Sequence, residues 1–308
     1  MEKNEKIFVT GQNEMIGSAI LHRLEESGFT RLITGSSGLK LTDQQAVGKF
    51  FMKEKPDYVF LTSSMIGGIL ANSQQPAEFI YTNLMSQTNV IHNAWKYGAK
   101  KLLFLASSCI YPKDCPQPMK EEYLLNGKLE PTSEPYAIAK IAGIRMCQSY
   151  NRQYGTRFIS VVPADVYGPG DDFNPETGHV QPALISKMHN AKIKREPAVV
   201  IWGDGSPRRE ALYVDDLADA CIFLMNNYDD SEMINVGSGE DISILELARS
   251  LSDTVGFKGE LVFDKSKPNG TLRKLLDTSK INKMGWSPKI SFKNGSEQTY
   301  QWYKEHCA

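Results

Sequence analysis

The chain has 308 residues, with 35 basic and 36 acidic side chains and a formal net charge of −1. This balance excludes a global attraction to nucleic acid or to an anionic membrane, so an anionic ligand would need a local basic cluster. Hydrophobic residues make up 41% and charged residues 23%, which is typical of a globular protein with a sizeable core. The length predicts one large α/β domain plus a smaller one.

Targeting and cysteine patterns indicate a cytoplasmic protein. Residues 1–6 are polar and run into a short apolar segment, so we expect no signal peptide, and no stretch reaches the ~18 apolar residues of a membrane span. The five cysteines are scattered and include no Cys-x-x-Cys pair. We therefore expect no disulfide framework, no metal site, no membrane association and no nucleic-acid partner.

The first half of the chain alternates short β-branched or aromatic runs with helical patterns. Strands are predicted at residues 7–10, 32–34, 58–62, 102–106 and 158–163. Helices are predicted at residues 16–27, 44–53, 77–97 and 136–154. This alternation predicts the α/β class, with a Rossmann-type doubly wound parallel sheet that carries helices on both faces.

The pattern loosens after Pro163, and residues 168–172 form a turn-rich break. We predict a dinucleotide-binding domain over residues 1–170 and a smaller α/β C-terminal substrate domain over residues 171–308. Residues 212–216 and 234–237 read as strands or strand ends, each followed by a helix. The chain is therefore expected to cross back to the first domain near residues 205–240.

A glycine-containing turn over residues 11–17 follows the first predicted strand and opens the first helix. This is the position of a dinucleotide-binding turn, where glycines let the backbone approach a pyrophosphate at a helix N-terminus. Its spacing resembles the G-x-x-G-x-x-G of short-chain dehydrogenases, but Glu14 replaces the middle glycine. If its carboxylate faces the pyrophosphate, Glu14→Gly should tighten cofactor binding.

The end of the second strand leaves the cofactor preference open. Residues 34–38 hold no Asp or Glu for a ribose 2′-hydroxyl, which argues against NAD. No arginine stands at Ser36 to hold a 2′-phosphate, so small hydroxyls and Lys40 are the remaining candidates.

The candidate catalytic residues lie in two short segments, Ser107-Ser108-Cys109 and the Tyr136-x-x-x-Lys140 pair. Tyr136 and Lys140 are four apart, which places them on one face of a helix. A lysine ammonium beside a phenol favours the phenolate, so we expect Tyr136 to exchange protons well below its usual pKa of about 10. Ser107 can orient a carbonyl oxygen, and Cys109 is a second acid/base group.

Longer motifs extend across essentially the whole chain. They lie at residues 66–69, 105–113, 134–140, 149–155, 178–180, 200–203, 208–210 and 266–268. In these motifs the chain resembles the GDP-L-fucose synthase family, which belongs to the extended short-chain dehydrogenases/reductases.

The resemblance implies an NADP(H)-dependent enzyme that epimerises C3 and C5 of GDP-4-keto-6-deoxy-D-mannose and then reduces C4. It implies a reductase triad of Ser107, Tyr136 and Lys140, and an epimerisation acid/base pair of Cys109 and His179. The implied cofactor-binding residues are Gly11, Asn13, Met15, Ile16, Gly17, Ser36, Ala106, Ser107, Tyr136, Lys140, Pro163, Val166 and His179. The implied substrate-binding residues are Ser108, Cys109, Lys187, Trp202 and Arg209.

In this interpretation Trp202 stacks on guanine, while Lys187 and Arg209 offset the pyrophosphate charge. The resemblance also implies a homodimer, in which the helices over residues 77–97 and 136–154 pair with their copies.

Three departures keep two other interpretations open: Glu14, Asp165 where the family usually has Asn, and Gly170 where it usually has His. The first alternative is a C4-reductase for a related GDP-4-keto-6-deoxy sugar, such as a heptose, that a separate enzyme epimerises. The second is a non-catalytic nucleotide-sugar-binding protein. Solvent deuterium incorporation tests the first, and cofactor titration tests the second.

Overall fold

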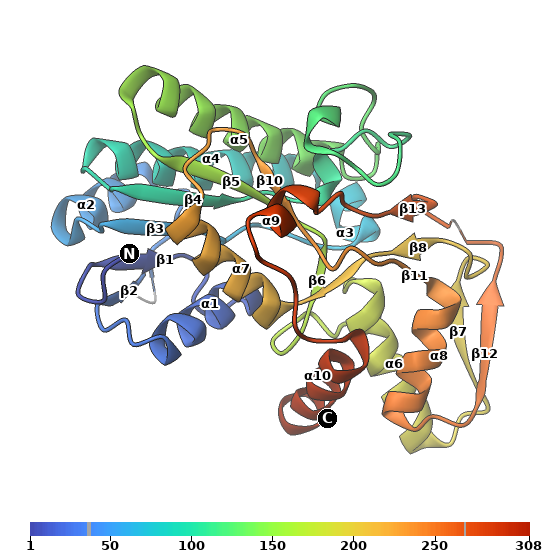
Figure 1. Cartoon of the computed structure of the whole chain (residues 1–308). Helices are drawn as coiled ribbons and strands as arrows, with labels where there is room; N and C mark the ends of the chain where they lie inside the picture. Colours follow the sequence, from blue (N-terminus) through green and yellow to red (C-terminus); the bar gives the residue numbers. More distant parts are fainter. Residues whose placement is uncertain (36–37, 268) are drawn as a thin grey trace.

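The structure is a computed structural model that describes residues 1–35, 38–267 and 269–308 (Figure 1). A six-stranded parallel sheet forms the larger lobe, with strand order β10-β5-β4-β3-β1-β2. Its strands are β1 (Ile7–Val9), β2 (Leu32–Thr34), β3 (Tyr58–Leu61), β4 (Lys101–Leu105), β5 (Phe158–Pro163) and β10 (Ile234–Val236). The predicted doubly wound α/β fold is confirmed.

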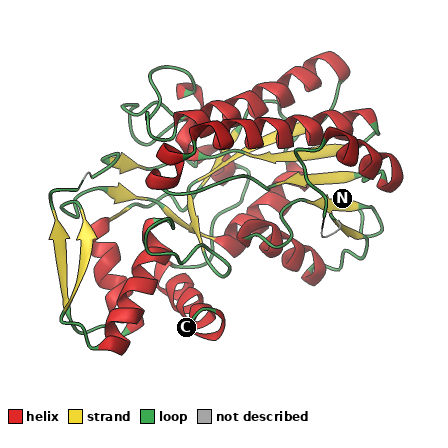
Figure 2. Ribbon diagram, turned by 180° about the vertical axis from the view of Figure 1, so that it is seen from behind, coloured by secondary structure: helices red, strands yellow, loops and turns green. Residues whose placement is uncertain are grey.

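Helices cover both faces of this sheet (Figures 1 and 2). One face carries α2 (Gln44–Glu54), α4 (Pro76–Lys96) and α5 (Glu134–Tyr154), and the other carries α1 (Met15–Glu26) and α7 (Val214–Asn227). Local sequence sets several helix ends. Asp43 caps α2, prolines stand in the first turns of α4 and α5, and Gly155 ends α5 in the left-handed conformation.

The strand order reverses direction around β1, which lies between β2 and β3. In doubly wound sheets, ligands bind outside the carboxyl ends of the strands at such a switch point. Thr10 links the carboxyl ends of β1 and β3, because its Oγ1 accepts hydrogen bonds from the amides of Thr62 and Ser63, both at 2.9 Å. The fold therefore provides a fixed crevice directly after β1 and β3.

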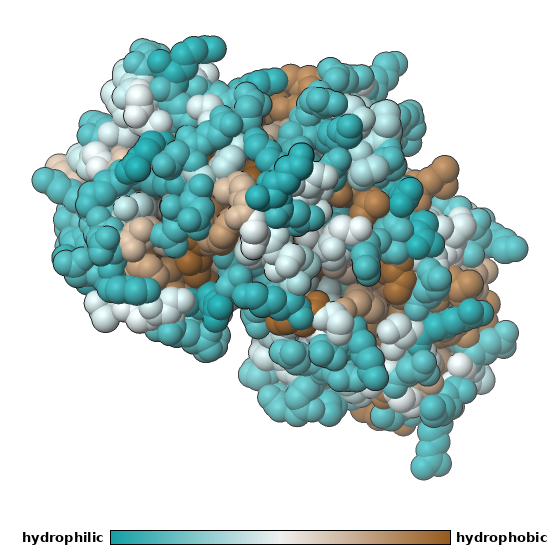
Figure 3. All heavy atoms as spheres, viewed as in Figure 1, coloured by the Kyte–Doolittle hydropathy of each residue, from teal (hydrophilic) through white to brown (hydrophobic). Residues whose placement is uncertain are grey.

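A smaller lobe packs around its own hydrophobic core. It contains α6 (Val180–Lys194), β7 (Ala198–Trp202), α8 (Ile244–Val255), β12 (Glu260–Asp264) and α10 (Phe292–His306). β7 pairs with β12, and Val200 and Val262 of this ribbon are exposed. Figure 3 shows hydrophobic side chains gathered along this side of the molecule.

Short strands connect the two lobes. β8 (Arg208–Arg209) lies between β11 (Ile242–Ser243) and β13 (Arg273–Lys274), and β6 (Asp165–Tyr167) pairs with β9 (Ala211–Tyr213). The remaining helices are α3 (Ile69–Gln74) and α9 (Ser279–Lys283).

The chain returns to the larger lobe after the smaller lobe has begun. α7 packs against α1, and β10 joins the edge of the large sheet beside β5. Leu276, Ile281 and Trp286 also belong to the larger core. Within the described residues, no helix combines the length and the apolar character needed to cross a membrane.

Candidate active site

The glycine turn after β1 has the geometry of a nucleotide cradle. Gly11 has φ +68°, and a Cβ on Gly17 would lie 2.1 Å from the carbonyl oxygen of Gly11, so only glycine permits this close approach. The side chain of Glu14 does not cap α1, which leaves first-turn amides facing the crevice. Oε1 of Gln12 is buried there without a partner among the described residues. These features fit a dinucleotide pyrophosphate at the start of α1.

Glu14 is directed into this cradle. Its Oε1 accepts a hydrogen bond from the Ser63 hydroxyl at 2.6 Å, and its Oε2 lies 2.7 Å from the position of a Cβ on Gly11. The carboxylate therefore spans the switch point between β1 and β3. A pyrophosphate in the cradle would meet this negative charge.

Ser107, Tyr136 and Lys140 come together at the carboxyl end of β4. Tyr136 and Lys140 are buried in the first two turns of α5, with exposures of 8% and 3%. The hydroxyls of Ser64 and Ser107 interact with the Tyr136 phenol. The Lys140 ammonium donates to the carbonyl oxygen of Leu105 at 2.9 Å and lies 5.7 Å from the centre of the Tyr136 ring.

The expected phenolate is a wrong prediction for this structure. Burial raises the pKa of Tyr136 above its usual value, and the charge of Cys109 adds to this rise, although Ser64 and Ser107 oppose it. Burial lowers the pKa of Lys140 to about 7, against the opposing charge of Glu14. Desolvation is the largest cause of both shifts, and it disfavours the phenolate and the ammonium alike. The raised pKa favours the protonated phenol.

Cys109 lies beside this group in a short 3-10 turn (Ser108–Ile110) and faces a cationic cluster from the small strands. Its Sγ is 3.7 Å from Nζ of Lys274. Arg209 lies next to Lys274, with its Nε 4.0 Å from a carboxylate oxygen of Asp165. The Arg209 guanidinium donates to the carbonyl oxygens of Arg208 and Thr271, at 2.8 and 2.7 Å. Strands β4, β6, β8 and β13 therefore meet at one point.

Other predicted cofactor residues follow the same edge of the sheet. Ala106 comes directly after β4, Pro163 ends β5, and Val166 lies in β6. Met15 and Ile16 begin α1, and Asn13 is exposed in the turn before it. Ser36 lies outside the described residues.

His179, Lys187 and Trp202 lie on the smaller lobe. His179 is exposed at the N-terminus of α6, near half-buried Asp171, whose pKa is raised to about 6 chiefly by desolvation. Lys187 is half-buried on α6, and Trp202 is 54% exposed with Nζ of Lys267 over its ring. No hydrogen bond or ion pair of the described chain joins these three residues to Cys109 or Tyr136.

Sequence reasoning missed Ser64 and Lys274. Ser64 follows β3, and its hydroxyl donates to Oδ1 of buried Asn83 at 2.9 Å, which fixes it beside Tyr136. Ser108 was predicted, and with Asp165, Glu210 and Lys274 it lines a small cavity below the site. The adjacent cations Arg273-Lys274, which match Arg208-Arg209, were the available signal in the sequence.

Comparison with known proteins decides the family. The "NAD dependent epimerase/dehydratase family" matches residues 7–237, which include the glycine turn and both catalytic segments. The chain belongs to this family.

Within the epimerase/dehydratase family, the chain is 53% identical to GDP-L-fucose synthase 1 of Arabidopsis thaliana, over 98% of this chain and 94% of that protein. It is 48% identical to the GDP-L-fucose synthase of Escherichia coli, over 98% and 97%. A GDP-mannoheptose C4 reductase from Campylobacter jejuni, solved with NADP bound, is 43% identical, with a TM-score of 0.91 over 99% of each chain. The resemblance predicted from the motifs is confirmed.

Proposed function

We propose that this protein is an NADPH-dependent enzyme that epimerises C3 and C5 of a GDP-4-keto-6-deoxy sugar and reduces its C4 ketone, as in GDP-L-fucose synthesis. One observation carries the proposal: Ser107, Tyr136 and Lys140 share a strand edge with Cys109 and its cations. One site thus combines a carbonyl proton donor with a second acid/base group. Similarity to two GDP-L-fucose synthases supports the substrate class.

In the reduction step, Ser107 and Tyr136 bind the C4 carbonyl oxygen. The Tyr136 phenol, whose pKa is raised by burial, donates its proton to that oxygen as negative charge develops on it. Lys140, anchored on the Leu105 carbonyl, orients the cofactor ribose and the phenol. Bound NADPH supplies the hydride.

In the epimerisation steps, the C4 ketone acidifies the hydrogens on C3 and C5. Removal of either hydrogen leaves an enolate, whose oxygen Ser107 and Tyr136 stabilise. Inversion requires a proton acceptor and a proton donor on opposite faces of the ring, and we assign these roles to Cys109 and His179. The exposed position of His179 on α6 implies that bound substrate completes the pair.

Basic residues at the lobe junction would hold the GDP moiety. Arg209 and Lys187 are half-buried, and burial lowers the pKa of each, so an anionic ligand would relieve the cost of their desolvation. Trp202 presents an exposed ring suited to stacking on guanine. We assign residues 1–170 to the dinucleotide domain and 171–308 to the substrate domain, with residues 205–240 crossing back.

The decisive experiment incubates the protein with NADPH and a panel of GDP-4-keto-6-deoxy hexoses and heptoses in deuterated water. NMR then identifies the product stereochemistry and the deuterium content at C3 and C5. We expect deuterium at both carbons and hydride from NADPH at C4. A reduced product without deuterium at C3 and C5 would contradict the bifunctional assignment.

The second candidate is a C4-reductase that acts on a GDP-heptose epimerised by another enzyme. Similarity to the Campylobacter GDP-mannoheptose C4 reductase favours it. Asp165 beside Arg209 also distinguishes this site from the usual family pattern. The same deuterium experiment separates the two candidates.

We further propose a homodimer formed through α4 and α5. These helices lie side by side on the outer face of the larger lobe and expose Tyr81, Ile138 and Tyr154. Sedimentation of Tyr81→Asp and Tyr154→Asp variants tests the dimer.

A cytoplasmic location is supported by the five cysteines, all of which are free thiols.

A further inference from the structure

Cys109 has a charged neighbour that the proposed mechanism does not use. Lys274 lies 165 residues further along the chain, yet its ammonium is 3.7 Å from the Cys109 sulfur. The contact joins the turn after β4 in the larger lobe to β13 at the lobe junction.

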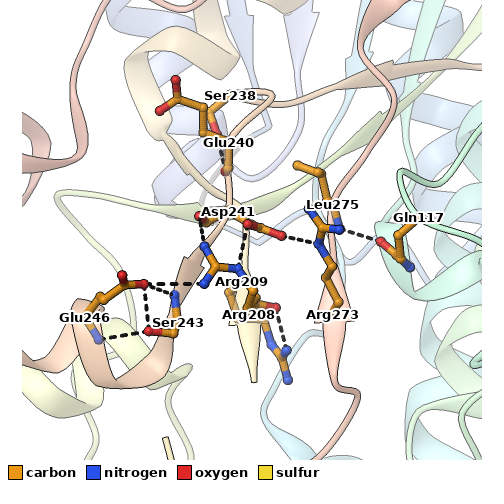
Figure 4. Close-up of polar contacts among 10 residues, drawn as sticks. All are labelled: Gln117, Arg208, Arg209, Ser238, Glu240, Asp241, Ser243, Glu246, Arg273 and Leu275. Carbon is orange, nitrogen blue, oxygen red and sulfur yellow. Dashed lines mark hydrogen bonds and ion pairs between the residues drawn. The ribbon is translucent and has the colours of Figure 1, made fainter. Parts of the chain in front are cut away.

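Ion pairs of Arg208 and Arg273 with Asp241 help to place Lys274 at this position (Figure 4). Nε of Arg208 lies 2.8 Å from one carboxylate oxygen of Asp241, and Nε of Arg273 contacts the other. The Asp241 side chain is almost fully buried between the two arginines, with an exposure of 7%. This clamp, made of Arg208, Asp241 and Arg273, holds β8 and β13 together.

The pairing of β8 with β13 places Arg208 and Arg273 on one face of the strands and Arg209 and Lys274 on the other. β13 runs parallel to β8, with Arg273 opposite Arg208 and Lys274 opposite Arg209. Successive side chains of a strand point to opposite faces. Because Arg208 and Arg273 face the Asp241 side, Arg209 and Lys274 face the catalytic side, and Figure 4 shows the Arg209 guanidinium directed away from Asp241.

The segment after Lys274 is fixed as well. The amide of Leu275 donates to Oε1 of Gln117 at 2.9 Å, and its carbonyl accepts from the amide of Met119 at 2.7 Å. The amide of Leu276 donates to Oε2 of buried Glu210 at 2.7 Å. Lys274 is therefore held by main-chain contacts on its C-terminal side and by the clamp on the opposite strand face.

The charged side chains around the Cys109 sulfur are mostly cationic. Two cations face it, Lys274 from β13 and Arg209 from β8. The opposing charge is that of Asp165 on β6, which lies 4.0 Å from Nε of Arg209, and the phenol of Tyr136 on α5 is a further titratable neighbour. Glu210, behind this cluster, has its pKa raised to about 7 by burial, so its negative charge is reduced. The pKa of Lys274 is raised chiefly by Cys109, so its ammonium stays charged beside the sulfur.

We propose that Lys274 is a positioning residue whose ammonium stabilises negative charge on the Cys109 sulfur. The use of the Cys109 thiolate in epimerisation rests on the proposed function. In that use the thiolate takes the proton from the carbon beside the ketone. The C–H bond breaks, an S–H bond forms, and the electron pair moves into the enolate, which His179 protonates on the other face.

The test measures the protonation of Cys109 directly, without substrate or cofactor. The full-length chain is alkylated with iodoacetamide between about pH 5 and pH 10, and the rate at each cysteine is read by peptide mass spectrometry, because only the thiolate reacts. The variants are Lys274→Met, Lys274→Arg and, as a matched control, Lys258→Met, which removes an exposed lysine of the same lobe. Exposed Cys307 is the internal reference, and buried Cys147 reports whether the fold has opened.

We expect the rate at Cys109 at pH 7 to fall by about tenfold in Lys274→Met, because the sulfur loses its neighbouring cation. Lys274→Arg should keep the wild-type midpoint, Lys258→Met should have no effect, and the Cys307 rate should be constant. A Cys109 profile in Lys274→Met that overlays the wild type would overturn the proposal. An equal shift in Lys274→Arg, with Cys147 still unreactive, would also overturn it, because geometry rather than charge would then be responsible.

Failure of the proposed function gives a different result. If the protein incorporates no deuterium at C3 and C5, it is not an epimerase, but the alkylation shift in Lys274→Met is still expected. If deuterium is incorporated and the shift is absent, the epimerase assignment stands and the role of Lys274 does not.

Discussion

The two sides of the active site differ in how firmly they are built. On the larger lobe, Tyr136 and Lys140 are buried in one helix and held by Ser64, Ser107 and the Leu105 carbonyl. On the smaller lobe, His179 and Trp202 are exposed, at a helix N-terminus and a strand end. The group proposed for reduction is therefore preorganised, whereas the groups proposed for epimerisation and GDP binding lie exposed on the other lobe.

Cys109 lies between these two sides and has contacts on both. Its turn belongs to the larger lobe, but its charge partner comes from β13. The comparison predicts that changes on the larger lobe will affect reduction selectively, and that changes at the junction will affect proton exchange.

The largest effect is expected for Tyr136→Phe. Loss of the phenolic proton should slow C4 reduction by about 10²–10⁴-fold while some deuterium exchange remains, because exchange does not need that proton. NADPH oxidation and NMR of C3 and C5 measure the two activities. Tyr123→Phe, in the 3-10 turn Glu121–Tyr123, is the control. Equal loss of both activities would show that the two sides are not separable.

Cys109→Ser should have the opposite selectivity. A serine hydroxyl is a far weaker acid than a thiol, so we expect deuterium exchange to slow by about 10²-fold. Reduction of a ketone that has already been epimerised should change much less. Cys307→Ser, at an exposed position, is the matched control. Reduction that slows as much as exchange would place Cys109 in the reductase group instead.

The clamp provides a stability test at the junction. Asp241→Asn should lower the free energy of unfolding by about 2 kcal/mol, because two arginines lose a charged acceptor. Burial acts to raise the pKa of Asp241, but Arg208 and Arg273 together lower it by more. The pKa of Asp241 therefore lies below its usual value. The contribution of the Asp241 carboxylate to the free energy of unfolding is therefore present above about pH 4. It is lost as the pH falls through the folded-state pKa of Asp241.

Urea unfolding at neutral and acidic pH measures this contribution. The wild type and Asp241→Asn should differ at neutral pH and converge in acid. Asp253→Asn, an exposed position, should have little effect at either pH. A difference that persists in acid would mean that the ion pairs do not carry the stabilisation.

Glu14 should give the smallest effect. Removal of its carboxylate from the cradle should tighten NADPH binding by about fivefold, the size expected for one charge about 4 Å away in a hydrated site. NADPH fluorescence titration measures this in Glu14→Gly and in Glu14→Gln, which separates charge from bulk. Exposed Glu25 on the same helix supplies the control Glu25→Gln. Unchanged or weaker binding would show that the carboxylate leaves the cradle when the dinucleotide enters.

The larger lobe was predictable because its signals are local. β5 has the predicted bounds, and Tyr136 and Lys140 share a helical face because four residues make about one turn. The protonation of Tyr136 was not predictable, since it depends on burial by residues from other strands. The direction of the Glu14 side chain was also not predictable, because Ser63 of β3's connecting segment determines it.

The junction was less predictable because its contacts are distant in sequence. The pairing of β8 with β13 brings Lys274 to Cys109. Each of these strands contains only two residues, and neither shows a strand pattern in the sequence. The smaller hydrophobic core likewise combines residues from Phe173 to Tyr303.

The alternation along β13 has a consequence for insertions and deletions. The carbonyl of Leu272 accepts a hydrogen bond from the Arg208 amide, and the amide of Leu276 donates to Glu210, so both ends of this short span are anchored. Loss or gain of a single residue between Leu272 and Leu276 would exchange the two faces of the strand. A lysine would then point toward Asp241, and an arginine or leucine would point toward Cys109. Divergence in chain length is therefore expected to leave the span from Leu272 to Leu276 unchanged and to accumulate in flanking loops.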